Sequence, residues 1–146
     1  MVSESLVEAY AAAEQRLRQL QRSPEAFDHP VGAVEWIETH ISWRLLAGDF
    51  VYKFKKPLKL DFLDFSTPAL RRAACEEELR INRRTAPQLY EVVVALIGTA
   101  AAPRMVALAD VRPHDVVLEY GVQMQRFADG QLLAEQLAAG ALAPSH

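Results

Sequence analysis

A chain of 146 residues is long enough to form one domain with a hydrophobic core. Its composition, 51% hydrophobic and 24% charged, excludes a disordered chain, and its net charge of −3 gives no general case for a nucleic-acid partner. The single cysteine, Cys75, excludes an internal disulfide framework and a cysteine-based zinc site. We expect a cytoplasmic protein, because no apolar run is long enough to span a membrane and no signal-peptide pattern opens the chain.

The first part of the chain is predicted to form one helix and three strands. Residues 5–21 carry an apolar stripe at helical spacing, and Ser5 and Glu8 have the spacing of a capping box. β-favouring residues then predict strands at 33–38, 42–46 and 50–55. A turn signal at 47–49 indicates that the last two of these strands pair as a hairpin.

The second part of the chain is predicted to form a long helix followed by further strands. Residues 59–65 are expected to be an irregular connector. Ser66 as N-cap and Pro68 in the first turn predict a helix that ends near Thr85. Apolar, β-branched runs then predict strands at 89–97, 105–109 and 116–127, and a last helix is expected at 131–139.

This order of elements predicts an α+β fold, in which a mainly antiparallel sheet carries one long packed helix in addition to the N-terminal helix. We divide the chain into an N-terminal helical extension (1–30), a central lobe (31–127) and a C-terminal helix with a short tail (128–146).

The strand at 50–55 runs into a group of lysines and is stopped by a proline. Alternation places Val51, Lys53 and Lys55 on one face and Tyr52 and Phe54 on the other. One interpretation is an edge strand whose lysines discourage pairing with another sheet. The other is a central strand with a phosphate-binding lysine that a carboxylate from a nearby helix holds in place.

Three consecutive glutamates in the second long helix are candidates for that carboxylate. Glu78 lies on the less charged stripe of the helix, between Cys75 and Ile81 at helical spacing, whereas Glu76 and Glu77 are predicted to point outward. A strand lysine followed about 25 residues later by a helix glutamate occurs in nucleotide-binding kinases, where the lysine neutralises phosphate charge and the glutamate positions the lysine.

Other catalytic signatures are missing from the sequence. The histidines are isolated, so no metal site is predicted, and neither a P-loop nor a complete Gly-rich dinucleotide motif occurs. The sequence disfavours a nucleic-acid partner, because one short basic stretch in an acidic chain is a poor electrostatic footprint.

A set of segments with specific order and spacing carries a resemblance that covers residues 27 to 142. The segments are 38–42, 46–49, 51–57, 62–67, 75–84, 86–90 and 122–127, the last followed by Gly130. They resemble the bacterial aminoglycoside-phosphotransferase-like proteins, which are often fused to a second, P-loop ATP-binding domain. The resemblance implies a protein-kinase-like N-terminal lobe with a five- to six-stranded sheet, and ATP with Mg as the cofactor.

Carried over residue by residue, the resemblance implies a nucleotide site. Lys53 becomes the phosphate lysine, with Lys55 second, and Glu78 becomes its partner, with Glu77 second. Val51 stands where such lobes touch the adenine. The resemblance further implies a hinge beside the adenine and a turn over the phosphates: Met124, Gln125 and Phe127 in the first, and Thr39 and Ser42 in the second. That turn departs from the kinase pattern because it contains no glycine.

The resemblance also implies what this chain does not contain. The catalytic aspartate and the metal ligands of such enzymes come from a C-terminal lobe, and residues 128–146 are too few to supply one. We therefore expect a nucleotide-binding lobe that is inactive alone and whose partners are ATP and a C-terminal lobe or downstream ATP-binding domain. The alternative is a non-catalytic module that holds an anion or a partner through Lys53–Lys59. Apolar residues such as Val116 and Leu118 are expected to be exposed in an isolated lobe, which favours self-association.

Overall fold

The computed structural model describes residues 2–99 and 101–126, with side chains from Leu6 onward. The expected helix at 131–139 and the segment 128–146 lie outside these residues. The described elements are α1 (Val2–Gln21), η1 (Pro24–Ala26), β1 (Glu35–Glu38), β2 (Ser42–Ala47), β3 (Phe50–Lys55), β4 (Lys59–Leu60), β5 (Leu63–Asp64), α2 (Pro68–Thr85), β6 (Tyr90–Gly98), β7 (Pro103–Ala107), η2 (Leu108–Asp110) and β8 (Val117–Gln125).

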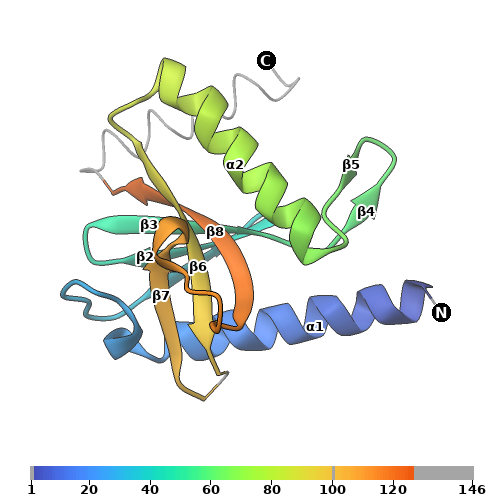
Figure 1. Ribbon diagram of the computed structural model, residues 1–146, viewed down its shortest axis with the longest axis horizontal. Coiled ribbons are helices and arrows are strands. Elements are labelled where there is room, and N and C mark those ends of the chain that lie inside the picture. The colour runs from blue at the N-terminus through green and yellow to red at the C-terminus, as the bar shows by residue number, and fades with distance from the viewer. Residues whose placement is uncertain (1, 100, 127–146) are drawn as a thin grey trace.

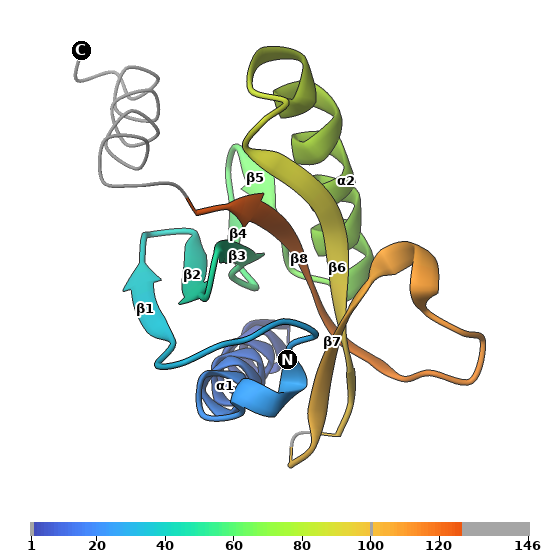
Figure 2. The ribbon, with the colours of Figure 1, turned by 90° about the vertical axis from the view of Figure 1, so that its left-hand side faces the viewer.

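Six strands form one antiparallel sheet in the order β1-β2-β3-β8-β6-β7, and α1 and α2 pack against its opposite faces (Figures 1 and 2). The predicted α+β fold is therefore confirmed. Within the described residues, neither helix combines the length and the apolar character that crossing a membrane requires.

The sheet separates two hydrophobic cores. The core on the α1 side joins Ala13, Leu17 and Leu20 of the helix to large strand side chains, among them Trp43 and Phe54. The core on the α2 side is smaller and contains Leu46, Val51, Cys75, Val93, Val122 and Met124. Because α1 shares a core with the sheet, the helix at the N-terminus is part of the packing that holds β3 in place.

The β2–β3 hairpin has the predicted position, and Gly48 adopts the left-handed conformation in its turn (φ +61°). β3 is the third of six strands, with β2 on one side and β8 on the other. The interpretation of β3 as an edge strand is therefore wrong. Local alternation could not exclude it, because β8 comes from a distant part of the sequence.

Several predicted boundaries are corrected by local hydrogen bonding. α1 begins at Val2, so Ser5 lies inside the helix and is not its N-cap. The N-cap of α2 is Thr67, whose hydroxyl accepts a hydrogen bond from the backbone N–H of Leu70 (3.1 Å). Ser66, the predicted cap, instead donates its hydroxyl to the Asp64 carboxylate (2.5 Å).

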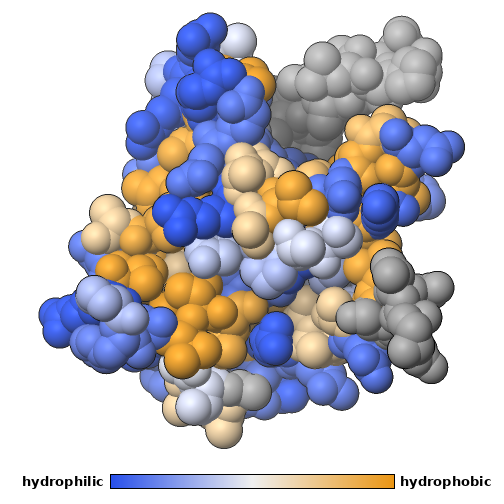
Figure 3. Space-filling view, turned by 45° about the vertical axis from the view of Figure 1, so that its right-hand side comes forward, coloured by the Kyte–Doolittle hydropathy of each residue, from blue (hydrophilic) through white to orange (hydrophobic). Residues whose placement is uncertain are grey.

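Three other segments also differ from the prediction. The connector at 59–65 is not wholly irregular, because β4 and β5 form a small hairpin in it. The predicted strand at 105–109 is replaced by β7, which starts earlier, and the turn η2. Val116 is exposed as expected, whereas Leu118 packs against the α1-side core. On the face seen in Figure 3, apolar surface gathers in patches between hydrophilic side chains.

A buried ion pair fastens the first turn of α2 to the middle of the sheet. Arg71 donates from Nε to Oε1 of Glu119 on β8 (3.0 Å) and from a terminal nitrogen to Oε2 (3.3 Å). A third donor of Arg71 bonds the carbonyl of Phe65 (2.9 Å). Burial raises the pKa of Glu119, and the Arg71 guanidinium acts against this shift. The paired geometry fixes the end of α2 from which the rest of the helix crosses the sheet.

Removing one partner of this pair should destabilise the fold strongly. We expect Glu119→Ala to lower the free energy of unfolding by about 3–5 kcal/mol, because it leaves the Arg71 charge buried without compensation. Glu76→Ala is the matched control, because Glu76 is about half exposed (49%) and its contact with Arg72 is a surface ion pair. Urea unfolding of both variants measures the difference, and equal midpoints would contradict this role of Arg71 and Glu119.

Candidate functional site

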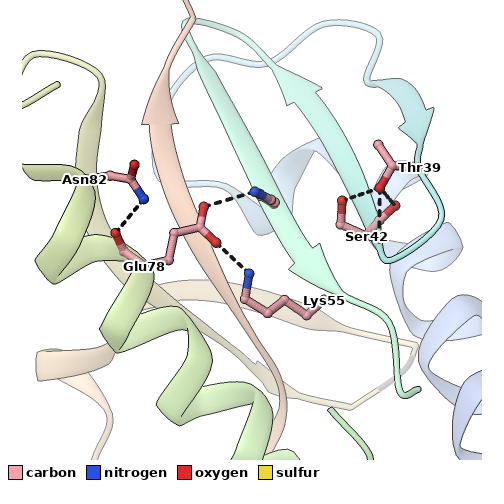
Figure 4. A network of polar contacts seen from close by, with 6 residues as sticks. Thr39, Ser42, Lys55, Glu78 and Asn82 are labelled. Atoms are coloured by element: carbon pink, nitrogen blue, oxygen red, sulfur yellow. Dashed lines mark hydrogen bonds and ion pairs between the residues drawn. The ribbon is translucent and has the colours of Figure 1, made fainter. Parts of the chain in front are cut away.

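One carboxylate on α2 holds two lysines of β3. Lys53 Nζ donates to Oε2 of Glu78 at 3.0 Å, and Lys55 Nζ donates to Oε1 at 2.5 Å. Figure 4 shows Glu78 reaching from the helix toward the strand with Lys55 below it. The structure thus joins the predicted lysine to the predicted glutamate and gives the second candidate lysine a place on the same carboxylate. Glu77 is exposed and pairs with Arg80 instead.

The positions of these side chains follow from the periods of their elements. Lys53 and Lys55 are two residues apart on β3 and so point to the same face, which α2 covers. Glu78 lies seven residues, two helical turns, after Arg71, so both point toward the sheet. The buried Cys75 lies between them on this face, whereas Ile81, predicted to flank Glu78, is 47% exposed.

Partial burial and mutual charge shift the pKa values in the cluster. Burial alone raises the pKa of Glu78, but the ammonium groups of Lys53 and Lys55 outweigh it and leave that pKa below its ordinary value. Burial lowers the pKa of Lys53, and although Glu78 opposes this shift, Lys55 and Arg44 reinforce it. In both Glu78 and Lys53, neighbouring positive charges contribute to the lowered pKa.

The cluster carries more positive than negative charge. Arg44 on β2 is the direct cross-strand partner of Lys53, but Arg44 has other interactions of its own, so the two ammonium groups of Lys53 and Lys55 make up the positive charge of the cluster. Glu78 supplies one negative charge against them. A surplus of cations in a sheltered position favours an anionic ligand, and phosphate groups accept hydrogen bonds from lysine ammonium groups.

Two of the residues predicted to contact the adenine lie on the same face of the sheet as Glu78, Lys53 and Lys55. Val51 and Met124 are paired across β3 and β8 and belong to the core that α2 covers. Gln125 ends β8, and its backbone N–H bonds Leu89 O (2.6 Å) within the sheet. The predicted hinge contact would therefore fall to its carbonyl or to Phe127, which lies outside the described residues.

Thr39 and Ser42 form a self-contained turn between β1 and β2. The Thr39 hydroxyl bonds the Ser42 hydroxyl (2.8 Å) and accepts from the Ser42 backbone N–H (3.0 Å), as Figure 4 shows. Ser42 is buried. These contacts build a tight Thr-based turn and do not join it to the Glu78 cluster, so the phosphate-covering role of the turn stays a prediction.

The lysines of the basic stretch do not form one surface. Lys53 and Lys55 meet Glu78 beneath α2, whereas Lys56 pairs with Glu38 on β1 (2.6 Å). Lys59 is exposed on the small β4–β5 hairpin. A ligand that needs all four charges side by side is therefore not favoured.

A separate cavity lies on the opposite face of the sheet from the Glu78 cluster. Its volume is about 620 Å³, and its wall includes Tyr52 and Gln123 together with Arg104 and Asp28. The Tyr52 hydroxyl is already held there by Gln123 (3.0 Å) and by a histidine ring. The lysine–glutamate cluster, whose side chains are between 8% and 18% exposed, does not line this cavity.

Two functional features escaped the sequence analysis. The ion pair of Arg71 with Glu119 was missed, although a glutamate inside the apolar run 116–122 is a signal that a buried partner exists. Arg44 was also missed, because its position beside Lys53 depends on the hairpin register. In residues 2–99 and 101–126 no group of three or more His, Cys, Asp or Glu could hold a metal ion.

The chain is similar to longer mycobacterial proteins. It is 38% identical over 115 residues to uncharacterized proteins of Mycobacterium tuberculosis and Mycobacterium bovis, and the aligned part is 77% of this chain but 20% of theirs. The chain therefore spans about a fifth of the length of the curated relatives it matches. No protein-family model matches the chain, and no solved structure matches it.

The charge state of Glu78 should contribute to stability in a pH-dependent way. Because its folded-state pKa lies below the ordinary value of 4.5, its contribution is complete above that pH and is lost as pH falls through the lowered value. We expect Glu78→Gln to be less stable than wild type by about 1.5–3 kcal/mol at neutral pH and for the gap to close in acid.

Urea unfolding of both proteins at a series of pH values measures this gap. Glu76→Gln is the control, because Glu76 is about half exposed (49%) in a surface pair. A gap between wild type and Glu78→Gln that stays constant down to strongly acidic pH would contradict the ion-pair assignment.

Proposed function

We propose that this chain is the nucleotide-binding N-terminal lobe of an ATP-dependent small-molecule phosphotransferase with a kinase-like architecture. The contact of Lys53 with Glu78 is the observation that carries the proposal. In such a lobe the lysine donates hydrogen bonds to the phosphates of the nucleotide, and the glutamate fixes the position of the lysine. The resemblance of the surrounding segments to aminoglycoside-phosphotransferase-like proteins supports the same assignment.

The sheltered surplus of positive charge in the cluster favours an anionic ligand. Lys53 and Lys55 bring two ammonium groups to the single carboxylate of Glu78. Beside these charges, Val51 and Met124 are buried in the apolar core that α2 covers, and a nucleotide base would pack against the edge of that core. ATP combines these two requirements.

Within residues 2–99 and 101–126, no group of three or more His, Cys, Asp or Glu could hold a metal ion. Mg that accompanies the nucleotide would take its ligands from outside the described residues, so we derive no step through it. The longer relatives leave room for a C-terminal lobe or a downstream ATP-binding domain as the natural partner of this lobe. Exposed Phe62 and Val116 (82% and 65%) are candidate contacts for that partner or for self-association. The buried free thiol of Cys75 fits a cytoplasmic location.

The second candidate function is a non-catalytic module that holds an anion or a partner through Lys53–Lys59. The dispersion of these lysines over three parts of the surface favours the nucleotide lobe over this candidate. It also disfavours a nucleic-acid partner, which needs a continuous basic face.

Nucleotide binding tests the proposal. We expect ADP and ATP to raise the melting temperature of the 146-residue chain, and Lys53→Ala to weaken binding by about tenfold or more because a charge-assisted hydrogen bond to phosphate is lost. Titration in a thermal-shift assay, followed by calorimetry, measures both effects.

Lys59→Ala is the matched control, since it removes the same charge from an exposed position outside the cluster. It should bind nucleotide like wild type. If wild type shows no response, or if Lys59→Ala and Lys53→Ala lose affinity equally, the proposed nucleotide site is wrong.

The chain on its own should not transfer phosphate. The family resemblance implies that the catalytic aspartate comes from a C-terminal lobe, so ATP consumption by the 146-residue chain, with or without small-molecule acceptors, should stay at the level of the Lys53→Ala variant. A sensitive phosphate-release assay measures this. Turnover that depends on Lys53 would refute the expectation.

A further inference from the structure

The two lysines on Glu78 are not equivalent. They bond different oxygens of the carboxylate, Lys53 at 3.0 Å and Lys55 at 2.5 Å. Either contact can therefore break while the other remains. The side chain of Lys53 is 18% exposed, whereas that of Lys55 is 8% exposed. An incoming ligand thus meets Lys53 first.

Lys55 is held by more than its ion pair. Its ammonium nitrogen lies 5.4 Å from the centre of the Phe65 ring, in a cation–π contact. Phe65 is itself tied to α2, because its carbonyl accepts from Arg71 (2.9 Å). Lys55 is therefore enclosed between Glu78 and the segment that leads into the helix.

The charges of the three side chains suggest a reason for two lysines to contact one carboxylate. If Lys53 alone compensated Glu78, its move toward a phosphate would leave a sheltered carboxylate close to an anionic ligand, which costs free energy. With Lys55 on the second oxygen, Glu78 stays neutralised while Lys53 directs its donors to the ligand. The full charge of Lys53 is then available for binding.

We propose that Lys55 is a positioning residue, which keeps Glu78 neutralised and in place so that Lys53 is released to bind the phosphates of the nucleotide. This inference rests on the proposed function of the site. In the kinase pattern one strand lysine both pairs with the helix glutamate and binds phosphate. Here Lys55 keeps the contact with Glu78, and Lys53 alone binds the ligand.

The pH dependence of ADP binding separates this role from simple packing. Lys53 must be protonated to bind phosphate, so affinity falls in alkaline solution as Lys53 titrates. Removing the like charge of Lys55 raises the pKa of Lys53. The charged and titratable groups around Lys53 are Arg44 on β2, Lys55 on β3, Glu78 and Cys75 on α2, and Glu119 on β8 beside Cys75. Burial raises the pKa of the Cys75 thiol to about 12, so Cys75 stays neutral through the titration.

The experiment is calorimetric titration with ADP at a series of pH values for wild type, Lys55→Met, Lys55→Arg and Lys59→Met. We expect Lys55→Met to bind ADP about tenfold more weakly at neutral pH, because the cluster loses one positive charge. Its alkaline inflection should move upward by about half a pH unit or more. Lys55→Arg should recover most of the affinity, and Lys59→Met should match wild type.

The outcomes distinguish the two proposals. If wild type binds ADP through Lys53 but Lys55→Met keeps the wild-type affinity and inflection, the role of Lys55 is wrong and the proposed function stands. Weaker binding with an unmoved inflection would reduce Lys55 to packing and likewise overturn the inference. If wild type does not bind ADP, both proposals fail. Should Lys55→Met not fold, Lys55→Gln, which keeps a hydrogen-bond donor without the charge, carries the same expectation.

Discussion

The contact of the Glu78 carboxylate on α2 with Lys53 and Lys55 on β3 is the interaction that the rest of the structure positions. Glu78 is placed by α2, and α2 is placed by the buried pair of Arg71 and Glu119 two turns earlier. The lysines are placed by β3, which is held between β2 and β8 and packed from its other face by α1. Packing in both cores therefore helps to fix the positions of Glu78, Lys53 and Lys55.

Burying charged side chains in this way costs free energy, and a stable fold does not require buried charges. Apolar side chains of similar volume commonly stabilise a protein as well as or better than a buried ion pair. Arg71 with Glu119 recovers the cost through paired hydrogen bonds and a third bond to a carbonyl. The Glu78 cluster does not balance its charges, since the ammonium groups of Lys53 and Lys55 share one carboxylate. Unbalanced, sheltered charge is typical of a binding site.

The sequence was sufficient for features that depend on local pattern. Alternation placed Lys53 and Lys55 on one face of a strand, helical spacing selected Glu78 over Glu77, and the turn at Gly48 defined a hairpin. Features that depend on distant pairing could not be predicted in this way. β3 is a central strand because β8 pairs with it. α2 is held on the sheet by the pairing of Arg71 with Glu119, which lies 48 residues later in the sequence. Competition for hydrogen bonds explains the capping error, since Asp64 takes the Ser66 hydroxyl and leaves Thr67 to cap the helix.

The most direct test of the central claim is lysine-specific chemical modification read out by mass spectrometry, with and without ATP. The lowered pKa of Lys53 gives it a larger unprotonated fraction at a given pH than an ordinary lysine has, which favours its modification when no ligand is present. The account predicts that ATP protects Lys53 selectively while the exposed Lys59 reacts at an unchanged rate. Equal reactivity of Lys53 in the presence and absence of ATP would contradict the claim that this cluster binds a nucleotide.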